Sequence, residues 1–115
     1  MPNFNINRED RVRLRHMLDA ASEIHQYVQS STREDLDKDR KLVHSLVRLF
    51  EIIGEAASQV SDELRENVIE IPWFIIIGMR NRLIHAYFEI NLDVVWRTSK
   101  DDIPSLIEEL KKLLG

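Results

Sequence analysis

The sequence predicts an all-α fold, an up-down bundle of four to five helices formed by a single domain over residues 1–115. Apolar residues recur at spacings of three and four along most of the chain, which is typical of helices with one buried face. The three glycines and three prolines are too few for a series of hairpin turns. The β-branched and aromatic run at 73–77 resembles a strand, but there is no second such run for it to pair with. We therefore expect it to be helical.

The first helix is expected over about residues 8–30, with Asn7 as its N-cap. The apolar residues that would form its buried face are Leu14, Met17, Leu18, Ala21, Ile24 and Val28. Residues 33–41 follow as a block of mixed charge around the single apolar Leu36. Such a block indicates a solvated connection, with room for a short helical turn.

The second helix, over about residues 39–60, is apolar on two stripes, so we expect it to pack on two sides. One stripe consists of Leu42, Leu46, Leu49, Ile53, Ala56 and Val60, and the other of Val43, Val47, Phe50 and Ala57. Ser61 is a suitable N-cap for a short segment that follows.

A third helix is expected over residues 73–86, with Pro72 in its first turn. Gly78 within it costs about 1 kcal/mol relative to alanine, and we expect another helix backbone to come close there. Asn91 is expected to cap a further helix, and Pro104 to begin the last one.

Composition limits the classes of function. Charged residues make up 31% of the chain and the net charge is −4, which argues against coating nucleic acid through a basic surface. The absence of cysteine fits a reducing compartment. The N-terminus lacks the pattern of a signal peptide, and no apolar run approaches the ~18 residues of a membrane span. We expect a soluble cytoplasmic protein.

The candidate functional residues are concentrated at 80–87 (RNRLIHAY), directly after the apolar run. If the helix continues through this segment, Asn81 and His85 lie about 40° apart around its axis, and Arg80 and Tyr87 about 20° apart. The long Arg80 side chain can swing back toward the imidazole one turn away. Four polar groups would then converge on one flank of the helix.

This combination suits cleavage of RNA without a metal ion, in which a 2′-hydroxyl attacks the adjacent phosphorus. A histidine can take or give a proton near neutral pH, so His85 would carry the proton, while the guanidinium of Arg80 would stabilise charge on the phosphate. Asn81 could orient the imidazole or the phosphate, and Arg82 could contact the substrate. Tyr87 could hydrogen-bond the substrate or stack on a base.

Each of these residues also has a common structural role. His85 could be an ordinary surface histidine, Arg80 and Arg82 could pair with carboxylates, Asn81 could cap a frayed turn, and Tyr87 could belong to the core. Taken singly, the structural role is the more frequent one. Their concentration within eight residues after a core segment favours function.

Other kinds of site find no support in the sequence. There is no H-E-x-x-H motif and no cysteine, so the usual zinc spacings are absent. The glycines at 54, 78 and 115 are isolated, so there is no glycine-rich phosphate loop. We expect an enzyme without metal or cofactor.

The segment at 80–87 reads R-N-x-x-x-H-x-Y, with I-P-W at 71–73, I-G-M at 77–79 and I-G-E-A-A at 53–57 before it. With R-L-R-H-M-L at 13–18 and D-I-P at 102–104, these motifs make nearly the whole chain similar to the HepT-like toxins of the HEPN superfamily.

The resemblance implies a metal-independent ribonuclease toxin on a helical bundle, acting as a homodimer with the two motifs facing each other across a cleft. Arg80 and His85 match the catalytic pair of that family. The resemblance also implies a nucleotidyltransferase antitoxin of the MntA type, which blocks such toxins by transferring AMP to the tyrosine that corresponds to Tyr87. An added phosphate there would repel RNA.

Two other hypotheses stay open. The chain could be a nuclease-inactive HEPN module that binds a nucleotide or a nucleotidyltransferase partner. It could also be a structural helical dimer in which the segment at 80–87 forms a salt-bridged interface. The sequence does not identify which RNA would be cut.

Overall fold

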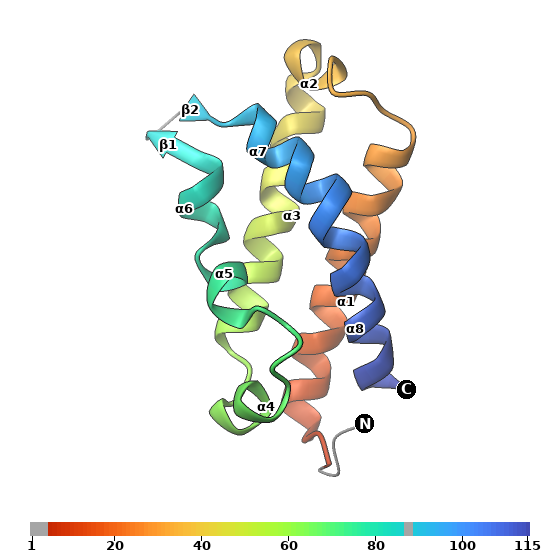
Figure 1. The fold of residues 1–115 in the computed structure, drawn as a ribbon, viewed down its shortest axis with the longest axis vertical. Coiled ribbons are helices and arrows are strands. Elements are labelled where there is room, and N and C mark those ends of the chain that lie inside the picture. The colour runs from red at the N-terminus through yellow and green to blue at the C-terminus, as the bar shows by residue number, and fades with distance from the viewer. Residues whose placement is uncertain (1–4, 87–88) are drawn as a thin grey trace.

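The computed structural model describes residues 5–86 and 89–115, except for the side chains of residues 85 and 86. Three long helical segments dominate the fold: α1 (Arg8–Gln29), α3 (Arg40–Ser58) and α8 (Ile103–Leu114). Figure 1 shows α3 at the centre, with α1 on one side and the shorter α5 (Trp73–Ile77) and α6 (Met79–Leu83) on the other. The all-α bundle predicted from the sequence is confirmed.

Shorter elements connect these helices. They are α2 (Asp35–Lys38), α4 (Asp62–Asn67), the strands β1 (Ile84–Ala86) and β2 (Glu89–Ile90), and α7 (Leu92–Arg97). The two strands pair antiparallel at one end of the bundle, as Figure 1 shows. Among the described residues, no helix has both the length and the apolar character needed to cross a membrane.

The predicted N-caps are confirmed. The side chain of Asn7 accepts a hydrogen bond from the backbone N–H of Asp10, and that of Ser61 accepts one from Leu64. Asn91 caps α7 in the same way. Because such caps satisfy backbone donors that the helix itself cannot, they fix where each helix begins.

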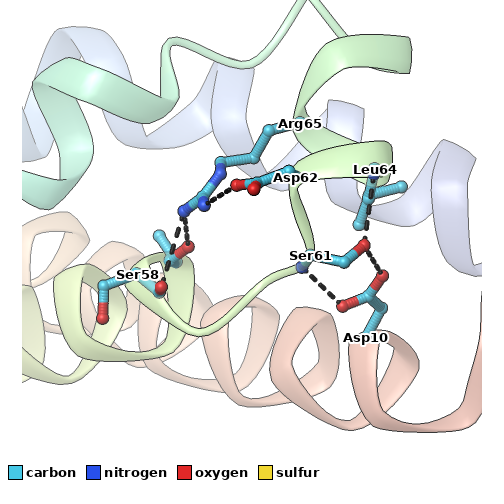
Figure 2. Close-up of polar contacts among 7 residues, drawn as sticks. Asp10, Ser58, Ser61, Asp62, Leu64 and Arg65 are labelled. Atoms are coloured by element: carbon cyan, nitrogen blue, oxygen red, sulfur yellow. Dashed lines mark hydrogen bonds and ion pairs between the residues drawn. The ribbon is translucent and has the colours of Figure 1, made fainter.

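Asp10 joins the start of α1 to the start of α4. Its carboxylate is 4% exposed and accepts hydrogen bonds from the Ser61 N–H at 2.9 Å and from the Ser61 hydroxyl at 2.5 Å (Figure 2). Figure 2 also shows Arg65 bound to Asp62 and to the carbonyls at the end of α3, which helps to terminate that helix. Polar contacts therefore hold this end of the bundle together.

The core lies where α1, α3 and α8 meet. Its fully buried large side chains are Leu14, Met17, Ile24, Val28, Leu46, Leu64, Ile71, Leu83, Val95 and Leu110. Both predicted stripes of α3 are largely buried, because α1 packs on one side of this helix and α5 and α6 pack on the other.

The close backbone approach expected at Gly78 occurs at Gly54 instead. A Cβ at Gly54 would lie 3.1 Å from the carbonyl oxygen of Ile76 and 3.5 Å from that of Ile77. A Cβ at Gly78 would meet only the Phe74 and Ile75 carbonyls of its own segment, at 3.5 and 4.0 Å. Gly54 therefore allows α5 to pack directly on α3.

The prediction of one helix over residues 73–86 was wrong in two respects. The segment divides at Gly78 into α5 and α6, and helix α6 ends at Leu83. Ile84 has extended dihedral angles (φ −117°, ψ 108°) and begins β1. The carbonyl of Leu83 accepts a 2.7 Å bond from the N–H of Asn91, which closes the hairpin between α6 and α7.

The last two predicted helices are joined without a break. Between α7 and α8 the chain forms a π-helical turn over Thr98–Asp102, in which Ile103 N–H bonds to the carbonyl of Thr98. Pro104 lies at the start of α8 and cannot donate a backbone hydrogen bond. The wider π turn accommodates the proline within a continuous helical segment.

Candidate functional site

The candidate cluster is divided between a helix and a strand. Arg80, Asn81 and Arg82 lie on α6, whereas His85 lies on β1. Because the backbone is already extended at Ile84, the helical geometry that would place His85 beside Asn81 does not apply. The side chain of His85 and all of Tyr87 lie outside the described residues, so their roles stay predictions.

Arg80 is held by a glutamate on the central helix. Its Nε donates a 2.7 Å hydrogen bond to Oε2 of Glu51, while the Arg80 side chain remains 60% exposed. Within the described part of the chain this is the only hydrogen bond of the Arg80 side chain. The two terminal nitrogens of the guanidinium are therefore open to a ligand, and their direction is set by the anchored Nε.

Glu51 is shared by two arginines. Its second oxygen, Oε1, lies 4.0 Å from a terminal nitrogen of Arg48, which is one turn earlier on α3 and 71% exposed. One carboxylate between two guanidinium groups leaves a local charge of about +1. The site can therefore attract a phosphate although the whole chain carries a charge of −4.

Arg82 faces a different direction from Arg80. Residues two positions apart in a helix lie about 200° apart around its axis. The two arginines therefore point to nearly opposite sides of α6. Arg82 lines a cavity between α5, α6 and the π-helical turn, and forms no ion pair among the described residues. Asn81 is exposed between the two arginines. Within one protomer, Arg80 and Arg82 are therefore not arranged to bind the same phosphate.

Arg33 anchors α7 close to the hairpin. Its guanidinium donates two hydrogen bonds to Oδ1 of Asp93, at 2.9 and 2.8 Å, and lies 3.3 Å from Asp37 of α2. The hydrogen bond with Asp93 is the main cause that raises the pKa of Arg33. These contacts tie α2 to the first turn of α7, which follows directly after β2.

Glu51 was not predicted from the sequence. It lies on the solvent-facing stripe of α3, with Lys41, His44, Arg48 and Glu55, where a glutamate is ordinary. Its partner is 29 residues away in the chain, so no local pattern marks the pair. The described residues contain no group of three or more His, Asp or Glu side chains placed to hold a metal ion.

Comparison with known proteins identifies the family. The family model for "Ribonuclease HepT-like" proteins matches residues 17–113. The chain is 39% identical, over 88% of its length and 90% of the relative's, to a protein of Caldanaerobacter subterraneus subsp. tengcongensis named "Putative RNase". It is 37% identical, over 87% of its length and 91% of the relative's, to the "Probable ribonuclease HepT" of Thermococcus cleftensis. No solved structure matches significantly. The chain belongs to the HepT-like ribonuclease family.

Proposed function

We propose that this protein is a metal-independent endoribonuclease that acts as the toxin of a toxin–antitoxin pair. Family membership supports the ribonuclease activity. The relatives that are 39% and 37% identical to this chain are named as a putative and a probable ribonuclease. The observation in the structure that carries the proposal is the Arg80–Glu51 pair. It presents an oriented, partly exposed guanidinium five residues before the histidine of the motif.

The proposed reaction is an attack of an RNA 2′-hydroxyl on the adjacent phosphorus. His85 takes the hydroxyl proton, the new P–O bond closes a 2′,3′-cyclic phosphate, and the bond to the 5′-oxygen breaks. The leaving 5′-oxygen is protonated as it departs. Arg80 donates hydrogen bonds to the non-bridging oxygens, where negative charge builds up in the transition state.

Glu51 supports this chemistry by holding Arg80 before the substrate arrives. Because the Nε bond fixes the plane of the guanidinium, little side-chain freedom is left to lose when the phosphate binds. Arg48 shares the same carboxylate and adds a second cation on the exposed face of α3. The pair of arginines around one glutamate suits a single phosphate more than it suits a neutral ligand.

A second protomer would complete the site. Arg82 points away from Arg80, so two facing copies of α6 can combine cations that one copy separates. We therefore propose a homodimer whose two motifs line a common cleft that binds RNA. Such a cleft concentrates positive charge locally on a protein that is acidic overall.

The proposed antitoxin is a nucleotidyltransferase that modifies Tyr87. The phenol oxygen would attack the α-phosphorus of ATP, with pyrophosphate as the leaving group, and tyrosine would keep the AMP. Tyr87 follows His85 by two residues, so the added phosphate would bring negative charge to the place where RNA must bind. Asn81 and Arg82 would contact or orient the substrate. The protein would act in the cytoplasm, where its RNA substrate occurs.

The test is induced expression in a bacterial host that lacks the antitoxin, comparing wild type with His85→Ala. We expect growth arrest and fragmentation of total RNA with the wild type only, at equal levels of soluble protein. An exposed histidine on α3 provides the control, His44→Ala, which should arrest growth as the wild type does. Intact RNA with soluble wild type would instead favour the nuclease-inactive module that binds a nucleotide or a nucleotidyltransferase. Full toxicity of His85→Ala would exclude His85 from the active site.

A further inference from the structure

Helix α5 carries an apolar surface that no described part of the protomer covers. Trp73 and Ile76 are buried against the core, but Phe74 is 92% exposed, and Ile75 and Ile77 are 51% and 39% exposed. Ile69, in the turn before the helix, is 81% exposed. A short helix that is apolar around its whole circumference packs on more than one side. A group of exposed apolar side chains with Phe74 at its most prominent point marks an interaction surface.

A cavity of about 380 Å³ opens beside this surface. Its floor is apolar and includes Phe50, Ile53 and Ile103, and its rim carries Arg82, Asp102 and Ser105. A cavity of about 150 Å³ inside a protein is enough to hold benzene. This cavity can therefore accept the ring of a phenylalanine.

The exposed ring and the cavity are neighbours on one face of the molecule. Pro72 and Ile75 line the cavity, and they also line the shallow depression in which Phe74 lies. In a two-fold symmetric dimer each protomer uses the same surface, so that surface must contain both the projecting group and its receptor. An unrelated partner would require only one of the two. Their presence side by side therefore favours a second copy of this chain as the occupant.

We propose that two copies dock through α5, so that Phe74 of each protomer fills the cavity of the other. The two-fold axis then passes close to Ile75. A phenylalanine buries roughly 150–250 Å² and stable interfaces bury roughly 1,200–2,000 Å². The two rings thus supply about a quarter of the area that the smallest stable interface needs.

This inference rests on the homodimer of the proposed function and names the surface that forms it. Because α6 follows α5 after Gly78, the docking brings both copies of the segment that contains Arg80 and Arg82 toward the axis. The surface can be tested without any measurement of RNA cleavage.

The first test is the molecular mass of the purified protein in solution over a range of concentrations, by light scattering after gel filtration. We expect a dimer for the wild type and a monomer for Phe74→Asp. Ser105→Trp, which closes the cavity from its exposed rim, should also give a monomer. Val12→Asp changes a 45% exposed valine on α1 and should leave the dimer intact. Circular dichroism would establish that each variant is folded.

The second test uses the absence of cysteine from the chain. A Phe74→Cys chain is mixed with a differently tagged Ser105→Cys chain under mild oxidation, and the disulfide between the two tags is counted. We expect this disulfide to form in high yield, and the pair Val12→Cys with Ser105→Cys to give almost none. A wild type that is monomeric at all concentrations, or a Phe74→Asp variant that remains a dimer, would overturn the inference.

The two proposals fail separately. A dimer that depends on Phe74 but cleaves no RNA would contradict the proposed function and leave the surface in place. RNA cleavage by a wild type whose dimer is unaffected by both Phe74→Asp and Ser105→Trp would contradict the surface and leave the proposed function in place.

Discussion

Replacing Glu51 with alanine tests the positioning of Arg80 apart from its charge. The Glu51–Arg80 hydrogen bond is 2.7 Å long, yet the Arg80 side chain is 60% exposed. An exposed ion pair of this kind contributes about 0–1 kcal/mol to folding, so the variant should remain folded. Ordering an arginine side chain costs up to about 2 kcal/mol of conformational entropy. Without Glu51, Arg80 must be ordered on the way to the transition state, which raises the activation free energy. An increase of about 2 kcal/mol corresponds to about 30-fold in rate.

The assay is steady-state cleavage of a fluorescent RNA oligonucleotide in the presence of EDTA. We expect kcat to fall by about 10-fold to 30-fold. KM should stay unchanged or fall, because the substitution removes a negative charge close to where the RNA phosphate would bind. Glu55→Ala removes the same charge one turn later on α3, where the carboxylate binds Gln59, and should keep the wild-type kcat. A kcat for Glu51→Ala within twofold of the wild type, or an equal loss in Glu55→Ala, would refute the positioning role.

Three further substitutions test the fold and its regulation. Asp10→Ala removes two hydrogen bonds to a buried carboxylate and should lower the free energy of unfolding by about 3 kcal/mol. Urea denaturation measures this, with the exposed Glu9→Ala as control. Equal stability of the two variants would contradict the role of Asp10. Gly54→Val places a Cβ 3.1 Å from the Ile76 carbonyl oxygen and adds two methyl groups to this tight contact, so it should cost about 1–3 kcal/mol. Gly78→Ala has room and should be neutral or slightly stabilising; the reverse order would refute the packing of α5 on α3. Tyr87→Phe should keep RNA cleavage but become insensitive to a cognate nucleotidyltransferase with ATP, and continued inhibition would place the modification elsewhere.

The helices and their caps could be predicted because their signals are local. Asn7, Ser61 and Asn91 each cap a helix through a contact three residues away, and the apolar spacing of α1 and α3 is set by the helical period itself. The hairpin was not predicted because the local pattern there favours a helix. Leu83 and Ile84 continue the apolar helical pattern, and the strands that replace it are three and two residues long. Pairs this short leave no alternating pattern to recognise.

The contact that positions Arg80 and the contact that joins the starts of α1 and α4 both connect distant parts of the sequence. Glu51 and Arg80 are 29 residues apart, and Asp10 and Ser61 are 51 apart. Both acids are common residue types in exposed helical positions. Only the packing of α3 against α6, and the contact of Asp10 with the N-cap residue of α4, distinguish them. The cluster at 80–87 is visible in the sequence because its unusual composition is contiguous in the chain, and its role as a site stays a prediction.

The most direct test of the proposed activity is cleavage of a defined RNA by the purified protein in EDTA, with mass spectrometry of the product ends. We expect the wild type to cleave and to leave 2′,3′-cyclic phosphates. His85→Ala should lose at least about 100-fold in rate, as is typical when a general acid–base group is removed, while the exposed Arg15→Ala on α1 should cleave as the wild type does. Cleavage by His85→Ala at the wild-type rate, or loss of all wild-type activity in EDTA, would contradict the proposed metal-independent mechanism.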